Sequence, residues 1–213
     1  MTLGWDNPAA APTTTILLRH GDTALSPEHR FSGLSDVPLS PDGTRQARAA
    51  ACRLAAGVPI NAVVSSPLER AAATAALAAD ELGLTAAVDD DLRETDFGDW
   101  EGLTLAEIQQ RWPADAAAWR RDPGQAPPGG ESFTEVALRV NRACDRLLHD
   151  HGGKTVLVVS HITPIKILLC RALDVPLAAM YRLYLGSACI NEIRWHEPGF
   201  ATVHRVNDTS HLP

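Results

Sequence analysis

Two histidines and two arginines follow short runs of strand-forming residues. The end of a strand is a position from which a fold can expose reactive side chains to a ligand. Arg19 and His20 follow Thr14–Leu18, His161 follows the run "KTVLVVS", and Arg70 comes one helical turn after "AVVSS". Imidazole titrates nearest neutral pH and serves as nucleophile, acid or base. Guanidinium groups bind two oxygens of a phosphate or carboxylate at once. The set therefore predicts an anion site with a histidine available for chemistry.

The elements that must position these side chains alternate between strand and helix along the chain. The predicted strands are Thr14–Leu18, Ala62–Ser65, Ala86–Val88, Lys154–Ser160, Ala188–Trp195 and Thr202–Val206. The predicted helices are Pro41–Ala56, Ser66–Leu82, Leu105–Trp112, Phe133–His149 and Pro164–Leu173. Strands separated by helices predict an α/β protein of three α/β/α layers, with a mostly parallel central sheet and helices on both faces. No internal repeat interrupts this order.

Two of the predicted helix starts come from capping residues. Ser40 precedes Pro41, which suits an N-cap followed by a proline in the first turn. Ser66 to Glu69 has the spacing of a capping box, which predicts that the second helix opens there. In sheets of this class, ligands bind beyond the carboxyl ends of the strands. Three strand ends therefore bring the arginines and histidines to one rim.

Composition excludes several other classes of protein. The formal net charge of −7 argues against a nucleic-acid surface, which needs a basic face. No window of about 18 apolar residues could span a membrane. The four cysteines form no C-x-x-C pair and are expected to be reduced thiols of a cytoplasmic protein. The run Asp89–Asp91 is typical of a solvated turn, so we expect neither a metal nor another cofactor.

The ends of the chain are expected to lie outside the folded domain. Residues 1–13 are rich in Ala, Pro and Thr, with no cationic start and no apolar run, so they predict a linker and not a signal peptide. The domain itself is expected over residues 14–207. Residues 208–213 are expected to form a short tail.

The motifs together resemble one known family. "RHG" at Arg19, "SSPLER" ending at Arg70, Glu94 ahead of "FGDWEG", and "SH" at His161 occur in the order typical of the histidine phosphatase (phosphoglycerate mutase-like) superfamily. The resemblance covers nearly the whole domain and implies the phosphoglycerate mutase-like fold. It implies that His20 attacks phosphorus and becomes a phosphohistidine. It also implies that Arg19, Arg70 and His161 bind phosphate and that Glu94 donates a proton.

Physical chemistry agrees with these implied roles. A nucleophilic imidazole must be neutral, and nearby arginines disfavour its protonated form. Gly21 would let the backbone approach the phosphate closely. A carboxylic acid can protonate the leaving alkoxide and then take a proton from the attacking water, with no metal. The residues alone do not distinguish Glu94 from its acidic neighbours Asp96, Asp99 and Glu101; the resemblance favours Glu94.

The short Gly/Pro-rich segment between Glu94 and His161 resembles the phosphatase branch of the superfamily. "PGGES" is similar to α-ribazole phosphatases and broad-range acid phosphatases. "RHGDTALSPEHRFSG" resembles the phosphatase half of actinobacterial ribonuclease H/acid phosphatase fusions, whose other half lies upstream. The implied function is a metal-independent phosphomonoesterase acting on a small phosphate ester. The alternatives are a phosphoglycerate-type mutase and an inactive phosphate-binding domain.

The substrate side of the pocket is harder to predict from the sequence. The partners implied are a small phosphate ester and inorganic phosphate as product, with no nucleic acid and no membrane, and a ribonuclease H domain upstream in a longer protein. Ser26 stands where related mutases carry an asparagine. The candidate substrate-binding residues are Thr23, Ser26, Arg30, Ser32, Glu131 and Ser132.

Overall fold

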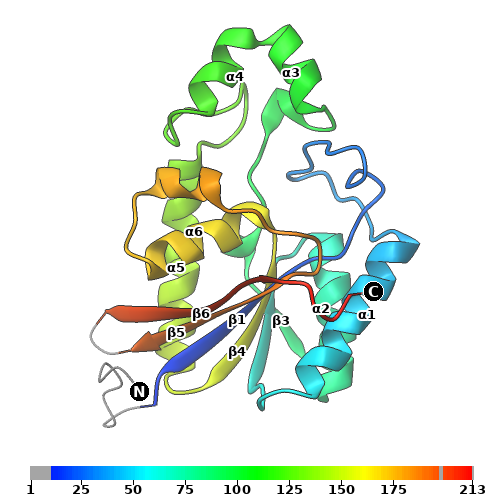
Figure 1. Ribbon diagram of the computed structural model, residues 1–213, viewed down its shortest axis with the longest axis vertical. Helices are drawn as coiled ribbons and strands as arrows, with labels where there is room; N and C mark the ends of the chain where they lie inside the picture. Colours follow the sequence, from blue (N-terminus) through cyan, green and yellow to red (C-terminus); the bar gives the residue numbers. More distant parts are fainter. Residues whose placement is uncertain (1–10, 197–198, 213) are drawn as a thin grey trace.

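Six strands form one sheet in the order β3-β2-β4-β1-β5-β6 (Figure 1). The computed structural model describes residues 11–196 and 199–212. The strands are β1 (Thr13–Arg19), β2 (Ala62–Ser65), β3 (Ala86–Val88), β4 (Thr155–Ser160), β5 (Ile190–His196) and β6 (Phe200–Asp208). The neighbours β3, β2, β4 and β1 are parallel, whereas β5 pairs antiparallel with both β1 and β6. The predicted mostly parallel sheet is confirmed.

Helices cover both faces of this sheet, which confirms the three-layer prediction. The α-helices are α1 (Pro41–Ala55), α2 (Glu69–Leu82), α3 (Leu105–Arg111), α4 (Pro113–Trp119), α5 (Phe133–Asp150) and α6 (Ile162–Ala172). The short 3-10 helices are η1 (Asp90–Leu92), η2 (Gly98–Trp100) and η3 (Leu177–Arg182). In Figure 1, α1 and α2 lie on one side of the sheet and α5 and α6 on the other. The pair α3–α4 stands apart from these layers, beyond the ends of the central strands.

Side-chain alternation along the central strands explains the two-sided core. Ile16 and Leu18 pack with α1 and α2, whereas Leu17 between them packs with α5 and α6. Val156 to Val159 in β4 are fully buried and alternate in the same way. A strand covered on both faces needs an apolar residue at every position, and burial of each such side chain contributes roughly 1.5–3 kcal/mol.

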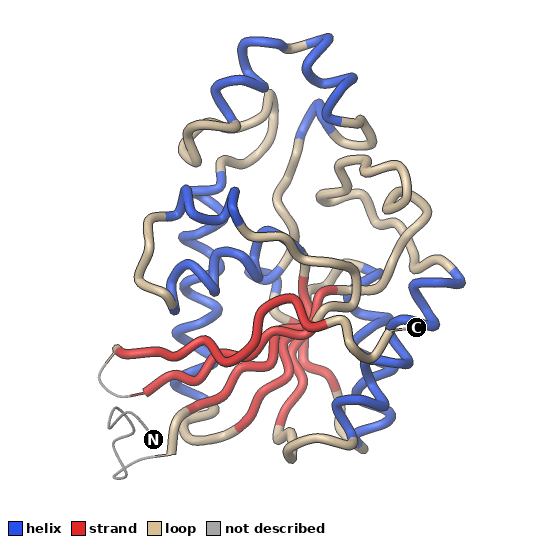
Figure 2. The backbone as a smooth tube through the Cα atoms, viewed as in Figure 1, coloured by secondary structure: helices blue, strands red, loops and turns tan. Residues whose placement is uncertain are grey.

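The register of the parallel strands places their carboxyl ends side by side at one end of the sheet. Arg19 is opposite Ser160 across the β1–β4 pair, and Ser65 is opposite Val159 across the β2–β4 pair. The residues that follow β1, β2 and β4 therefore emerge together. Figure 2 shows long loops gathered between this end of the sheet and the α3–α4 pair. The site described below lies there.

The structure corrects the start of one predicted helix and adds a helix that was not predicted. The second helix begins at Glu69, with Leu68 at the N-cap and no side-chain cap. Ser66 does not form the predicted capping box, because Glu69 N donates to Asp36 Oδ1 at 2.6 Å. The Ser66 hydroxyl instead accepts from Leu68 N at 3.3 Å and lies 2.7 Å from His161 Nε2. Helix α4 was not predicted, because its Ala-rich stretch follows Pro113 directly after α3 with no capping side chain.

The predicted domain ends differ slightly from the elements observed. Thr13, the last residue of the predicted linker, begins β1, and Asp208 of the predicted tail ends β6. Most of that linker, residues 1–10, and Pro213 lie outside the described residues. Within the described ranges, no helix combines the length and apolarity that crossing a membrane requires.

Candidate active site

His20 follows β1, and contacts at both ring nitrogens fix its orientation. Its Nδ1 lies 2.7 Å from the carbonyl oxygen of Gly21. A carbonyl oxygen only accepts hydrogen bonds, so this contact places the ring proton on Nδ1 and leaves a lone pair on Nε2. Arg70 Nε donates to that Nε2 at 3.3 Å. His20 is 7% exposed, and its unprotonated Nε2 is the nitrogen that can attack an electrophile.

The environment keeps both histidines of the site neutral. Burial lowers the pKa of His20 well below its ordinary value, and the charges of Arg19 and Arg70 lower it further. Burial also lowers the pKa of His161 well below that value, with His20 and Arg70 as the next causes. The two rings lie 5.1 Å apart between centroids. At neutral pH this pair is therefore uncharged beside two guanidinium groups.

Arg70 links the nucleophile candidate to a surface loop. Its side chain is fully buried, and burial lowers its pKa. Its Nη1 donates to Ser35 O at 3.0 Å, and its Nη2 donates to Gly33 O at 2.7 Å and to Ser32 O at 3.1 Å. One guanidinium therefore holds both the His20 ring and the loop at residues 32–35.

Arg19 and His161 each keep a buried nitrogen without a protein partner. Arg19 Nη1 donates to Leu185 O at 2.9 Å, but its Nε has no hydrogen-bond partner among the described residues. His161 Nε2 contacts Ser66 Oγ, and its Nδ1 has no such partner within the same ranges. Buried polar groups are normally bonded, so these two suit a ligand. We call Arg19, His20, Arg70 and His161 the histidine–arginine floor.

Glu94 lies beside this floor and is 5% exposed. Its Oε1 accepts from Thr95 N at 2.8 Å, and its Oε2 accepts from Thr163 N at 3.3 Å. Of the four acids that the residues alone left open, Glu94 lines the same cavity as His20, and Asp96, Asp99 and Glu101 do not. Glu101 instead accepts bonds from the loop at residues 33–35.

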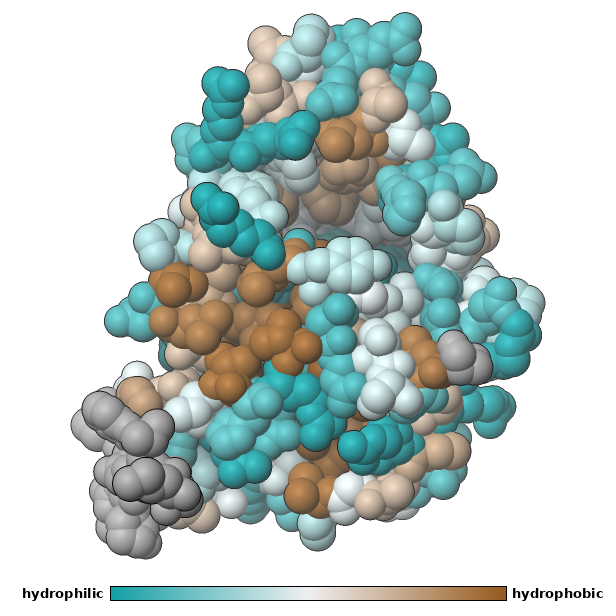
Figure 3. All heavy atoms as spheres, viewed as in Figure 1, coloured by the Kyte–Doolittle hydropathy of each residue, from teal (hydrophilic) through white to brown (hydrophobic). Residues whose placement is uncertain are grey.

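A cavity of about 310 Å³ connects Arg19 and His20 of the floor to solvent, whereas Arg70 and His161 are fully buried and do not line it. Figure 3 shows the surface hollowed between the α3–α4 end and the rest of the molecule. Five aromatic side chains from separate segments line one side of the cavity, and we call them the aromatic wall. They are Phe31, Phe97, Trp119, Phe133 and Tyr181. Neighbouring rings contact one another at centroid distances from 4.8 Å to 6.4 Å.

Four of the predicted substrate-side residues line the cavity: Thr23, Ser26, Arg30 and Ser32. Ser26 Oγ accepts from Thr23 N at 2.9 Å, so it also closes a local turn. Arg30 donates to Glu28 in its own loop, to Gly102 O and to Glu107, and the contact with Glu107 ties the loop to α3.

The other two predicted substrate-side residues do not line the cavity. Ser132 caps α5 in a capping box with Glu135. Glu131 accepts a forked pair of hydrogen bonds from Arg139. Both side chains therefore bond within the fold, because they stand where the Gly/Pro-rich loop enters α5.

Gly21 is required by a close contact that differs from the one the sequence suggested. A Cβ at this position would collide with the backbone carbonyl of Gly43 in α1, and a Cβ at Gly43 would collide with that of Asp22. The glycine of "RHG" therefore lets the loop after β1 pack on the first turn of α1.

A model of the histidine phosphatase superfamily (branch 1) matches residues 15–209. The chain belongs to the histidine phosphatase superfamily. It is a phosphatase of this superfamily, and the relatives that match it over 85% or more of its length include proteins named as a phosphoserine phosphatase and a glucosyl-3-phosphoglycerate phosphatase.

Three similar proteins illustrate this membership. The bifunctional protein Rv2228c of Mycobacterium tuberculosis is 49% identical over 98% of this chain. The chain spans only 57% of the length of that relative. A mycobacterial glucosyl-3-phosphoglycerate phosphatase in complex with inorganic phosphate is 33% identical, with a TM-score of 0.81 and coverage of 94% of this chain and 99% of that one. The α-ribazole phosphatase of Shigella flexneri is 29% identical, with a TM-score of 0.82 and coverage of 92% and 96%.

The structure adds two residues to the phosphatase site that sequence reasoning missed. Thr163 contributes a backbone N–H, which leaves no signature in a sequence. Lys166, one turn further along α6, lines the cavity, and burial lowers its pKa. The available signal was its position in the first turns of the helix that follows His161. Among the described residues, no three His, Cys, Asp or Glu side chains gather so that they could hold a metal ion.

Proposed function

We propose that this phosphatase is a metal-independent phosphomonoesterase that forms a phosphohistidine at Nε2 of His20. The observation that carries the proposal is the contact between His20 Nδ1 and Gly21 O, which leaves Nε2 unprotonated beside Arg70. Neutral imidazole is the nucleophilic form, and burial among arginines keeps the ring in that form. The same arginines supply the positive charge that a phosphoryl transition state needs.

The reaction proceeds in two balanced steps. The lone pair of His20 Nε2 attacks phosphorus, the bond from phosphorus to the alcohol oxygen breaks, and Glu94 gives its proton to the departing alkoxide. The Glu94 carboxylate then takes a proton from water, whose oxygen attacks phosphorus and releases phosphate from Nε2. Arg19, Arg70 and His161 hold the phosphoryl oxygens in both steps.

We further propose that the alcohol part of the substrate is small and has a flat or apolar face. The cavity of about 310 Å³ and its aromatic wall support this substrate class. An α-ribazole phosphate, whose alcohol carries a flat aromatic base, fits that description. The similarity to the Shigella flexneri α-ribazole phosphatase supports the same class.

A larger protein is proposed as the natural context of the domain. Rv2228c is named as bifunctional, and this chain matches a little over half of it. We propose that the full-length protein carries a ribonuclease H domain upstream of the phosphatase and works in the cytoplasm. Reading the coding sequence upstream and assaying the full-length protein for both activities tests this.

Phosphate release from a panel of esters, measured in excess chelator, tests the proposed reaction. The parent should hydrolyse a small ester in chelator, and His20→Ala should abolish turnover while its circular dichroism stays unchanged. A base-stable, acid-labile phosphoprotein should be trapped in the parent only. Loss of turnover in chelator that a divalent metal restores would contradict the proposal. Transfer of phosphate to a second phosphoglycerate instead of water would favour a mutase.

A further inference from the structure

The segment that carries Glu94 has no regular secondary structure, yet the carbonyl groups of Arg93 and Glu94 are hydrogen-bonded. Residues 93–97 belong to no helix or strand. Buried carbonyls without partners cost free energy, so the segment needs donors from elsewhere. Side chains of Arg139 on α5 and Ser160 at the end of β4 supply them. The four carbonyls bonded in this way are those of Arg93 and Glu94 in the segment and those of Asp91 and Leu92 in η1 just before it.

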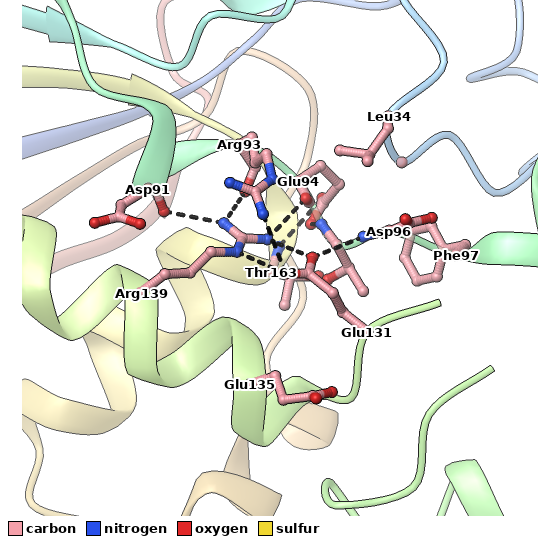
Figure 4. A network of polar contacts seen from close by, with 12 residues as sticks. Leu34, Asp91, Arg93, Glu94, Asp96, Phe97, Glu131, Glu135, Arg139 and Thr163 are labelled. Carbon is pink, nitrogen blue, oxygen red and sulfur yellow. Dashed lines mark hydrogen bonds and ion pairs between the residues drawn. The ribbon is translucent and has the colours of Figure 1, made fainter. Parts of the chain in front are cut away.

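Arg139 is 3% exposed and bonds with every N–H of its guanidinium group. Its Nη1 donates to Asp91 O at 2.9 Å and to Arg93 O at 2.6 Å. Its Nη2 donates to Glu94 O at 2.8 Å and to Glu131 Oε2 at 2.9 Å, and its Nε donates to Glu131 Oε1 at 3.1 Å. An arginine has five such donors, and here all five are used (Figure 4).

Glu131 extends this hydrogen-bond network to the backbone on the other side of Glu94. Its Oε2 accepts from Asp96 N at 3.0 Å, and Arg93 Nη2 lies 3.4 Å from its Oε1. Burial by itself would raise the pKa of Glu131, but the bonds from Arg139 and Asp96 N outweigh it and lower the pKa. The carboxylate is therefore charged and bridges Arg139 to the backbone beyond Glu94.

The position of the Glu94 carboxyl group depends on this backbone. One oxygen is held by the next N–H in the chain, that of Thr95, and the other by Thr163 N of α6 at 3.3 Å. A displacement of the Glu94 backbone would break the second contact and move the carboxyl relative to His20. Misplacement by about 1 Å can cost roughly 10²-fold in rate.

We infer that Arg139, with Glu131, is a positioning residue for proton transfer by Glu94. It touches neither substrate nor reacting atoms, and it acts by fixing the carbonyl of Glu94 and the N–H of Asp96. The inference rests on the proposed role of Glu94 as proton donor. It gives the predicted substrate residue Glu131 a different part in the same reaction.

Single-turnover rates with an alkyl phosphate and an aryl phosphate of an acidic phenol test this inference. An acidic phenol leaves without protonation, so loss of the acid slows the alkyl ester selectively. Glu94→Gln should slow the alkyl ester about 10²–10⁴-fold and the aryl ester little. Arg139→Lys keeps the charge but has three donors in place of five, and it should slow the alkyl ester about 10–10²-fold with little change in the aryl rate.

The double variant tests most directly whether Arg139 acts through Glu94. If Arg139 acts only through Glu94, adding Arg139→Lys to Glu94→Gln should cost the alkyl ester no further rate, because the effects of coupled residues do not add. The matched control is Arg142→Lys, one turn further along α5, where the arginine is exposed and pairs with the side chain of Asp91. This control should leave both rates unchanged.

Several results would overturn the inference. Arg139→Lys could slow both esters equally, its cost could add to that of Glu94→Gln, or Arg142→Lys could reproduce it. If Arg139→Lys does not fold, Glu131→Gln, which keeps size but loses charge, makes the same test with the same expected selectivity. If Glu94→Gln itself leaves the alkyl-to-aryl ratio unchanged, the proton donor is misassigned and the inference falls with it. A selective Glu94→Gln beside an unselective Arg139→Lys refutes the positioning role alone.

Discussion

The histidine–arginine floor, which reaches the cavity through Arg19 and His20, and the aromatic wall are built in different ways. The floor residues come from strand ends and the first turn of α2, and hydrogen bonds fix their orientation. The wall residues come from loops, short helices and the start of α5, and they contact one another ring to ring. Directional bonds set the geometry that chemistry needs, whereas ring packing tolerates change. We therefore expect the floor to determine the rate of the reaction and the wall to determine which alcohol binds.

Arg70→Lys tests the floor and should have the largest effect. Lysine cannot donate to His20 Nε2 and also to the carbonyls of the loop at residues 32–35, and it cannot bind two phosphoryl oxygens as a fork. Loss of an arginine from a phosphoryl site costs about 10³–10⁵-fold in rate, so kcat/KM should fall by about 10³-fold or more for every ester. Arg45→Lys on the exposed side of α1 is the control and should be neutral. A fall in kcat/KM of less than tenfold would contradict the claim that the floor, and not the wall, determines the rate.

Trp119→Ala tests the wall with a smaller and more selective effect. Trp119 contacts Phe31, Phe133 and Tyr181, so its removal opens the wall. An aromatic contact contributes about 0.5–1.5 kcal/mol, so KM for an aryl phosphate should rise up to about tenfold, with kcat unchanged. Steady-state kinetics with glycerol phosphate should show little change. Equal losses for the two esters would mean that Trp119 supports the floor.

The floor should also make stability depend on pH in a way that the wall does not. The folded-state pKa of His20 lies below its ordinary value of 6.5, so below that pH the unfolded chain binds more protons. Stability is therefore complete above about pH 6.5 and is lost as the pH falls. Each such histidine contributes a slope of up to about 1.4 kcal/mol per pH unit.

Urea unfolding at several pH values measures that slope. His20→Asn should flatten the curve of unfolding free energy below pH 6.5, and the slopes of parent and variant should agree above pH 7, where the imidazole is neutral in both states. Trp119→Ala should keep the parent slope. An unchanged slope in His20→Asn would show that His20 is not buried as a neutral ring.

The floor could be predicted from the sequence because strand periodicity and sheet topology determine where its residues lie. Apolar runs mark β1 and β4, and parallel strands place Arg19, His20 and His161 at a single edge. Glu94 lies in an irregular segment, and its choice over Asp96 depended on a family resemblance. The cavity lining agrees with that choice.

The remainder of the site depends on tertiary contacts that have no local signal. Ser66 has the spacing of a helix cap, yet its hydroxyl faces His161, whose strand is far away in sequence. Glu131 is polar and close to the loop tip, yet Arg139 turns it inward. The aromatic wall assembles from segments as distant as Phe31 and Tyr181, and no periodicity relates them. Side chains whose role is set by a distant partner are the ones that sequence reasoning misplaced.

The central claim is that Nε2 of His20 accepts the phosphoryl group, and isomer analysis of the trapped phosphoenzyme tests it most directly. The enzyme would be quenched in alkali during turnover of a phosphorus-labelled ester, and tandem mass spectrometry of its peptides would locate the label. Alkaline hydrolysis and chromatography would then separate the two phosphohistidine isomers. Because Nδ1 donates to Gly21 O, we predict label on His20 and the Nε2 isomer. The Nδ1 isomer, or label on His161 or Ser66, would contradict the account.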